Sequence, residues 1–348
     1  MLNLIIPACG KSTRFPNLRP KWLLTHPLGT SMLQESISGL DLTNVVRIVA
    51  VVLKQHVDEY QFVDAISQSI NDDRFEFVVL DKPTDSQPET IAKAIKKAKI
   101  EGAICCKDSD NFFKADISSH VTPINFVGAI DLRKIGRIDA GNKSYVLTDN
   151  KNNIVNIAEK DVISNTFCCG LYGFESAEKY LKYYDSIKDR NDIYVSHVIH
   201  SMLLAGENFK FEEADDFVDW GTLEDWNKFR NQYKTLFVDI DGVIVGASSN
   251  YMHPFLGKTE GLKENIDALN KLYDTGKVTV VMTTARFERY RELTEDQLEK
   301  EGLKYHSLIM GLPHAKRIVI NDFAASNPYP SCEAVNLPRN VGCLKEFI

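Results

Sequence analysis

The stretch that most constrains the fold is residues 4–24, where a short apolar run leads into a loop of small residues. The run Leu-Ile-Ile at 4–6 predicts a buried strand. Small residues after a strand leave backbone N–H groups open to a phosphate, and nearby cations neutralise its charge. The stretch therefore predicts a phosphate-binding loop at the carboxyl end of a strand. The residues of this stretch suited to that task are Ala8, Cys9, Gly10, Arg14 and Lys21.

Apolar runs of strand length alternate with helical patterns along the next part of the chain. This alternation predicts an α/β domain whose sheet is mostly parallel, Rossmann-like and covered on both faces. Such sheets bind ligands at the carboxyl ends of their strands. The expected strands are 45–53, 75–80 and 103–106, and the expected helices are 31–40 and 90–100.

From residue 124 to 174 the apolar runs become shorter and polar turns separate them, as at residues 149–153. This pattern predicts antiparallel hairpins added to the sheet. The chain then continues with expected helices at 176–187 and 192–204, and with a return to the sheet at 211–220.

A second domain is expected because 348 residues are too many for one ordinary core. A new apolar strand begins at residue 235, so the boundary is expected near Gln232. The predicted domains are residues 1–231 and 232–348.

Composition limits the partners and the compartment. A net charge of −7 argues against a nucleic-acid-binding surface. We see no signal peptide and no apolar run of membrane-spanning length, which predicts a cytoplasmic protein without a membrane partner. The seven cysteines are odd in number and lack CxxC spacing, so buried thiols are expected. The sequence leaves open whether the chain forms a homo-oligomer.

The loop resembles the signature of the nucleotidyltransferases that make NDP-sugars and CDP-alcohols, which have small-small-Gly-x-x-x-Arg followed by Pro-Lys. Here Ala8-Cys9-Gly10 leads to Arg14, and Lys21 follows Pro20. The resemblance covers roughly residues 1–230. It implies transfer of a nucleotide from an NTP to a phosphorylated acceptor, with release of pyrophosphate, and Arg14 and Lys21 as the cations that stabilise the phosphates.

The resemblance also implies a site for Mg²⁺, which prefers carboxylates, waters and substrate oxygens. Asp108 and Asp110 follow an expected strand, and Asp219 lies in an Asp-Trp-Gly-Thr turn like that of the family. Gln87 falls where family members contact the base. The residues expected near the phosphorylated acceptor are Glu159, Lys160 and Gly170.

Residues 237–243 resemble the first motif of haloacid-dehalogenase-like phosphatases. The resemblance implies Asp239 as the nucleophile and Asp241 as the acid and base. Strands are expected at 278–284 and 317–321. By their match to the later motifs of this family, Thr284 would hold the phosphoryl group, and Asp322 would bind a second Mg²⁺ together with Asp239. Lys316 is the best candidate for the lysine that binds the phosphate, with Arg317 as the alternative. Asn321 departs from the two acids that many members carry there. The short segment between the first two motifs implies a capless Rossmann-like domain.

Together these patterns predict a bifunctional enzyme of bacterial capsule or surface-polysaccharide precursor synthesis. Its expected substrates are CTP and a phosphorylated sugar, polyol or aminoalcohol, with a phosphatase step in the second domain. Two alternatives stay open: the second domain is an inactive structural or oligomerisation module, or the whole chain is a nucleotide-sugar-binding or regulatory protein.

Overall fold

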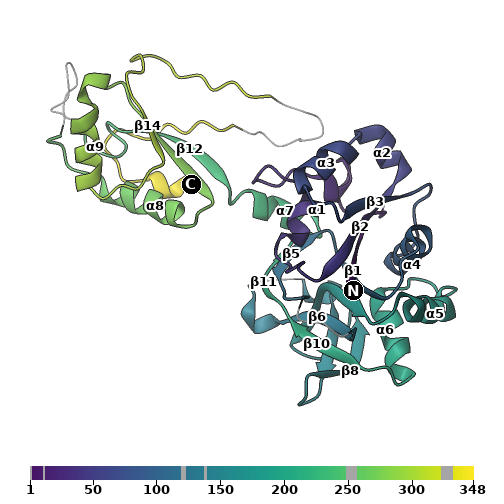
Figure 1. Cartoon of the computed structure of the whole chain (residues 1–348). Coiled ribbons are helices and arrows are strands. Elements are labelled where there is room, and N and C mark those ends of the chain that lie inside the picture. The colour runs from purple at the N-terminus through teal and green to yellow at the C-terminus, as the bar shows by residue number, and fades with distance from the viewer. Residues whose placement is uncertain (1, 11, 119–122, 137–138, 248–256, 323–331) are drawn as a thin grey trace. The chain divides into compact units, whose positions relative to one another are not determined.

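The computed structural model of the chain describes residues 2–10, 12–118, 123–136, 139–247, 257–322 and 332–348. The chain divides into two compact units, Met1–Asn227 and Lys228–Ile348. The sequence placed this boundary between residues 231 and 232. We call these the first unit and the second unit (Figure 1).

The first unit is built on a mixed sheet with nine strands among its described residues, in the order β3-β2-β1-β4-β9-β6-β10-β8-β7. Four neighbouring strands at one end of this order pair in parallel, as the alternating pattern predicts. Each is an apolar run, and β1 and β4 are buried along nearly their whole length. These strands are β1 (Leu2–Pro7), β2 (Val45–Leu53), β3 (Phe75–Leu80) and β4 (Ala103–Lys107).

Antiparallel strands extend the sheet beyond β4, so that the sheet is mixed rather than mostly parallel. The strand β9 pairs antiparallel with both β4 and β6, and β7 and β8 form a hairpin across the polar turn at 149–153. The strand β10 pairs in parallel with β6. The bounds are β6 (Asn125–Asp131), β7 (Ser144–Thr148), β8 (Asn153–Glu159), β9 (Thr166–Phe174) and β10 (Phe209–Glu213).

Helices cover both faces of this sheet and bury two separate apolar cores. One face packs against α4 (Gln87–Ala98), α5 (Ala177–Ile187) and α6 (Val195–Leu204), which lie together in Figure 1. The other face packs against α1 (Met32–Ser38) and α3 (Val63–Ile70), with α2 (Lys54–Tyr60) between β2 and α3. The last helix of the unit, α7 (Leu223–Arg230), continues into the second unit.

The expected return of residues 211–220 to the sheet is only partly correct. The strand β10 joins the main sheet, but β11 (Asp215–Asp219) pairs instead with β5 (Asn111–Lys114) in a small two-stranded sheet. Strand β5 comes directly after β4 in the chain but lies outside the main sheet. Its edge is therefore available for pairing with β11.

The cysteines largely follow the expectation of buried thiols. Cys9 and the two adjacent pairs are buried, whereas Cys332 is exposed and Cys343 is half-buried. Burial raises the pKa of the Cys9 thiol to about 12, which keeps this thiol protonated near neutral pH.

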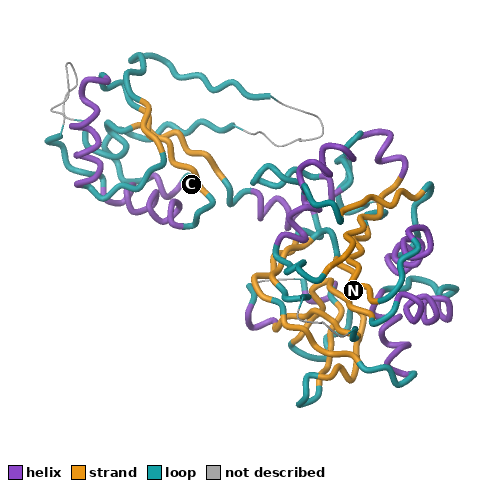
Figure 2. The backbone as a smooth tube through the Cα atoms, viewed as in Figure 1, coloured by secondary structure: helices purple, strands orange, loops and turns teal. Residues whose placement is uncertain are grey.

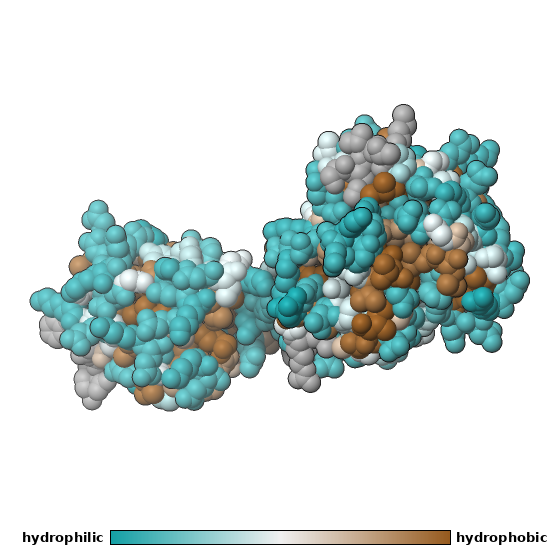
Figure 3. All heavy atoms as spheres, turned by 90° about the horizontal axis from the view of Figure 1, so that it is seen from below, coloured by the Kyte–Doolittle hydropathy of each residue, from teal (hydrophilic) through white to brown (hydrophobic). Residues whose placement is uncertain are grey.

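No described helix is long and apolar enough to cross a bilayer. Hydrophilic side chains cover most of the face shown in Figure 3.

The second unit contains a three-stranded parallel sheet in the order β12-β13-β14. Its apolar core joins this sheet to two helices whose inward residues include Ile266, Leu269 and Leu298. The elements are β12 (Lys234–Asp239), α8 (Lys263–Asp274), β13 (Val278–Thr283), α9 (Arg291–Lys300) and β14 (Ser307–Ile309).

The expected strand at 317–321 is wrong. These residues lie in the loop that follows β14, described over residues 310–322 (Figure 2). The side chains of Ile318, Val319 and Ile320 are 71%, 66% and 91% exposed. An apolar run forms a strand only when a neighbouring strand accepts its hydrogen bonds. Among the described residues the sheet ends at β12 and β14, and residues 317–321 pair with neither of these edge strands.

Candidate active site

The signature loop begins where β1 ends and lines a cavity of about 430 Å³. The N–H of Ala8 donates to the main-chain oxygen of Val51, which anchors the loop to β2. A Cβ at Gly10 would meet no atom within 4 Å, so the space beside this residue is open. The predicted residues that line the cavity are Ala8, Cys9, Gly10, Arg14, Lys21, Gln87, Asp108 and Asp110.

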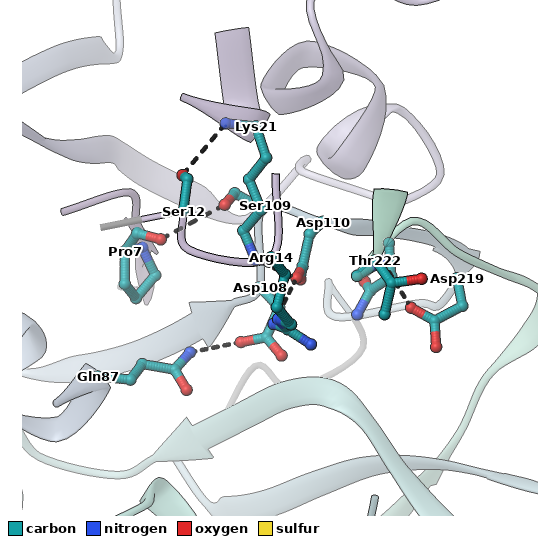
Figure 4. Close-up of polar contacts among 12 residues, drawn as sticks. Pro7, Ser12, Arg14, Lys21, Gln87, Asp108, Ser109, Asp110, Asp219 and Thr222 are labelled. Carbon is teal, nitrogen blue, oxygen red and sulfur yellow. Dashed lines mark hydrogen bonds and ion pairs between the residues drawn. The ribbon is translucent and has the colours of Figure 1, made fainter. Parts of the chain in front are cut away.

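Helix α4 brings Gln87 to this cavity. Ser86 caps the helix by accepting from the N–H of Glu89, and Pro88 stands in the first turn, where it needs no N–H partner. Gln87 is the first helical residue, and its side-chain amide donates to the Asp108 carboxylate. Figure 4 shows these two side chains pointing toward each other. Gln87 therefore orients Asp108.

Asp110 is held by the two cations of the signature loop. Lys21 forms a salt bridge with its carboxylate, and a guanidinium nitrogen of Arg14 lies 3.6 Å from the same oxygen (Figure 4). Burial alone would raise the pKa of Asp110, but the charges of Lys21, Arg14 and Lys143 outweigh it and hold this pKa well below its usual range. Asp110 is thus ionised at neutral pH.

Asp108 behaves in the opposite way. Burial, followed by the charge of neighbouring Asp110, raises its pKa to about 6, although Lys107, Gln87 and Lys21 oppose the shift. Gly170 in β9 faces this carboxylate with φ +85°, and a Cβ there would overlap the Asp108 side chain. The positive φ and the close approach together require glycine at this position.

The β5–β11 pair brings Asp219 to Asp110. Asp219 pairs with Asn111 in this ladder, and Trp220 donates its N–H to the main-chain oxygen of Asp110 at 2.9 Å. A Cβ built on Gly221 would lie 3.0 Å from an Asp219 oxygen and 3.5 Å from both Arg14 and Asp110. The two acids and Arg14 therefore converge on one point.

Lys143, which the sequence did not single out, forms a salt bridge with Asp219. Lys107 was also missed: it is fully buried under the acids and donates to the main-chain oxygens of Asp108 and Asn111 at 2.7 and 3.0 Å. Burial lowers the pKa of Lys107 to about 8, with the charge of Asp108 opposing the shift. The position of Lys107 directly before the acid pair is the one signal that could have indicated it.

Glu159 and Lys160 lie apart from the cavity lining. Glu159 accepts hydrogen bonds from the hydroxyls of Ser144 and Ser196, which tie β8 to β7 and to α6. Lys160 donates to the Tyr194 hydroxyl at 2.7 Å, and its ammonium lies 4.6 Å from the centre of the Tyr194 ring. In this structure both side chains make contacts within the fold.

The acids fit a magnesium ion by their chemistry. Mg²⁺ is commonly bound through one or two carboxylates with the remaining positions taken by water and phosphate oxygens. Asp110 and Asp219 supply two carboxylates at the same place, while Asp108 is directed toward Gln87. Within the described part of the chain, no three His, Cys, Asp or Glu side chains gather closely enough to hold a metal without such substrate ligands.

In the second unit, β12 and β13 place two predicted residues at one sheet edge. Asp239 pairs with Thr283, so that it lies beside the buried Thr284. Arg317, not the exposed Lys316, reaches Asp239, at 3.1 Å. Because 317–321 form no strand, Asp322 lies in the exposed loop rather than at a sheet edge.

Asp241 is occupied by an ion pair. The guanidinium of Arg286 donates to both Asp241 oxygens, at 2.9 and 2.7 Å, and also to Thr294 and Gln297. Arg286 is buried, so its charge depends on these partners for compensation. The predicted acid and base of the second unit is thus held in a bidentate contact.

The chain is similar in structure to enzymes that handle nucleotides. A nucleoside-diphosphate-sugar pyrophosphorylase from Vibrio cholerae RC9 matches with 20% identity and a TM-score of 0.56, over 66% of this chain and 99% of its own. A protein assigned as a glucose-1-phosphate thymidylyltransferase from Bacillus anthracis matches with 18% identity and a TM-score of 0.53, over 66% and 94%. No protein-family profile and no curated protein matches the chain in sequence. The likeness shows that the chain shares the α/β fold of these two nucleotidyltransferases over the matched part.

Proposed function

We propose that the first unit is a metal-dependent nucleotidyltransferase that acts on an NTP and a phosphorylated small molecule. One observation carries the proposal: Asp110, Arg14 and Lys21 line the cavity at the signature loop, and Asp219 meets Asp110 and Arg14 beside it, around Gly221. Both solved structures described above are assigned to nucleotidyl transfer by name, which supports the same reaction class here.

In this reaction a phosphate oxygen of the acceptor attacks the α-phosphorus of the NTP. The new P–O bond forms as the bond to the β-phosphate breaks, and the electron pair leaves with pyrophosphate. Arg14 and Lys21 line the cavity, where their positive charges would stabilise the charge that develops on the phosphates. Asp110 and Asp219 would hold Mg²⁺, which when bound neutralises phosphate charge and orients the phosphates. No protein nucleophile is required.

We assign CTP as the NTP and a phosphorylated sugar, polyol or aminoalcohol as the acceptor, in the cytoplasm and for surface-polysaccharide precursors. The support for CTP is that two motifs, Lys-Trp-Leu-Leu at 21–24 and Asp-Ser-Asp-Asn at 108–111, fit a cytidylyltransferase better than a guanylyl- or uridylyltransferase. Gln87, which also lines the cavity, is the assigned contact for the base.

The test is pyrophosphate release from each of four NTPs with a panel of phosphorylated sugars, polyols and aminoalcohols. Activity with one NTP and one acceptor class, lost on chelation of Mg²⁺, supports the proposal. Binding of a nucleotide-sugar without pyrophosphate release in any combination favours the alternative of a binding or regulatory protein.

A second function, phosphate monoester hydrolysis, is favoured by Asp239 and Thr284 at one edge of a parallel sheet. In this proposal Asp239 attacks phosphorus as the bond to the leaving oxygen breaks, and water then hydrolyses the aspartyl-phosphate and releases phosphate. Thr284 would hold the phosphoryl group, and Asp239 would help to hold a second Mg²⁺. Asp241 would have to exchange its contact with Arg286 to act as an acid. A phosphatase assay with a generic monoester, comparing the wild type with Asp239→Asn, tests it. Equal, negligible hydrolysis by both proteins favours the structural-module alternative.

A further inference from the structure

Two lysines face each other across the β7–β8 hairpin but send their ammonium groups in different directions. Ser144 pairs with Glu159, and the next residues outward, Lys143 and Lys160, are joined by a 3.1 Å main-chain hydrogen bond. Lys160 reaches Tyr194, whereas Lys143 reaches Asp219. The hairpin thus delivers one of its two lysines to the acids.

Lys143 is not an ordinary surface lysine. Its side chain is only 17% exposed, and that of Asp219 is 20% exposed. Its ammonium also lies 5.4 Å from the centre of the Phe217 ring. Lysines are rarely buried to this extent unless they are paired. The position of Lys143 therefore indicates a cation that its pairing with Asp219 holds beside the acids.

The lysine stands outside the nucleotide cavity. Arg14, Lys21 and Asp110 line that cavity, but among its described lining residues neither Lys143 nor Asp219 occurs. In-line transfer requires the attacking oxygen to approach the phosphorus from the side opposite the leaving group. A cation that borders the acids from outside the NTP cavity can therefore meet an acceptor phosphate that approaches the α-phosphorus from there.

Resting on the proposed function, we propose that Lys143 binds the phosphate of the acceptor, a dianionic phosphate monoester, and that Lys160 does not. An ammonium group has three donors, so Lys143 can keep its contact with Asp219 while it donates to a phosphate oxygen. Its charge lowers the repulsion between the acceptor dianion and the NTP phosphates as the oxygen attacks. The Lys160 ammonium lies at Tyr194, whereas that of Lys143 lies at Asp219, so Lys160 lacks the position beside the acids.

The kinetic test compares four variants of the full chain: Lys143→Met, Lys143→Arg, Lys160→Met, and Lys151→Met in the exposed hairpin turn as a neutral control. With the acceptor on which the wild type is active, Lys143→Met should raise the acceptor KM about tenfold or more and leave the NTP KM within about twofold, because one charged phosphate contact is lost. Lys143→Arg should restore most of the affinity, since it keeps the charge. An unchanged acceptor KM in Lys143→Met, or a larger increase in Lys160→Met, overturns the assignment.

A binding test separates this inference from the proposed function. Inorganic phosphate is titrated into each protein with Mg²⁺ and saturating inorganic pyrophosphate, which stands in for the phosphates of the NTP, and binding is followed calorimetrically. Lys143→Met should weaken phosphate binding about tenfold relative to Lys151→Met, for the same lost contact. Equal phosphate affinities overturn the role of Lys143. Absence of turnover by the wild type with every acceptor would instead overturn the proposed function, and the phosphate titration would still decide about Lys143.

Discussion

The main-chain N–H of Trp220 donates a 2.9 Å hydrogen bond to the main-chain oxygen of Asp110. This bond continues the β5–β11 ladder, in which Asp219 pairs with Asn111. Backbone hydrogen bonds therefore fix the relative position of two carboxylates that are far apart in the sequence. A pair of carboxylates held in this way is preorganised to bind a cation.

The first prediction concerns this acid pair. Asp110→Asn or Asp219→Asn should lower nucleotidyl transfer about a hundredfold or more, because charge stabilisation at the phosphates is lost. The measurement is pyrophosphate release at saturating substrates. Asp216→Asn, which changes an exposed acid on the same strand, should remain within about twofold of the wild type, as is usual for surface changes. Near-normal transfer by either site variant would contradict the assignment.

The second prediction concerns the cations of the signature loop. Arg14→Ala and Lys21→Ala should each cost about 2–4 kcal/mol of transition-state stabilisation, in line with the loss of one preorganised charge-stabilising group. The loss is measured as the ratio of kcat/KM for the NTP. Arg19→Ala is the comparison, because Arg19 lies in the same loop but bonds to Thr25 rather than to an acid. An equal loss in Arg19→Ala would show that loop structure, not charge at Asp110, is responsible.

Much of the nucleotide cavity could be predicted because its signals are local. Residues 8–21 and the acids after β4 each follow a strand directly, and parallel strands bring such ends to the same edge. Local order and spacing were therefore enough to place Gly10, Arg14 and Asp110 around one cavity. Gln87 was singled out by the family resemblance, and the start of α4 brings it to the same cavity.

Lys143 could not be predicted because the hairpin register is irregular. The turn pairs Thr148 with Ile154, and continued evenly this register would place Lys143 opposite Glu159. The register instead shifts between Leu147 and Thr148, so that Glu159 faces Ser144. A one-residue shift changes which side chain points to which face, and a bulge leaves little trace in the sequence.

The prediction of a strand at 317–321 was wrong for a related reason. Apolar composition predicts that a segment prefers to be a strand but does not tell whether a partner edge accepts it. The short strand β14 supplies the partner of β13, although its three residues gave no signal. The expected position of Asp322 at a sheet edge depended on this pairing, and without it Asp322 lies in the loop after β14.

The third prediction concerns Gly170. Gly170→Ala should destabilise the first unit and lower transfer, because an added Cβ would overlap the Asp108 carboxylate at a positive φ. The positive φ alone should cost about 1–2 kcal/mol. The matched control is Gly206→Ala, which has nearly the same φ, +86° against +85°, but meets no atom within 4 Å.

The difference between these two alanine variants isolates the overlap with Asp108, expected at about 1–3 kcal/mol. Urea unfolding followed by tryptophan fluorescence measures it in the first unit, because the three tryptophans, Trp22, Trp220 and Trp226, all lie there. Equal free energies of unfolding in the two variants would show that Asp108 moves aside at no cost.

The last prediction is a pH dependence that arises at His26. Its imidazole is buried against the rings of Trp220 and Trp226, and Nδ1 accepts the N–H of Leu28 at 3.3 Å. Burial lowers the pKa of His26 below its usual value near 6.5, with the charge of Glu35 opposing the shift. The folded chain therefore favours the neutral ring.

Because the folded-state pKa lies below the unfolded-state pKa, the unfolded chain binds more protons in the range between them. The contribution of His26 to the stability of the first unit should accordingly be full above pH 6.5 and fall as the pH is lowered toward the folded-state pKa of His26. His26→Asn, whose side-chain oxygen can replace Nδ1 as an acceptor, should flatten this fall even if it lowers stability at pH 7.5. Free energies of unfolding at pH 7.5, 6.5 and 5.5, read from tryptophan fluorescence, give the slope, with His200→Asn as an exposed-histidine control. If His26→Asn loses as much stability between pH 7.5 and 5.5 as the wild type, the pH sensitivity of this unit arises elsewhere.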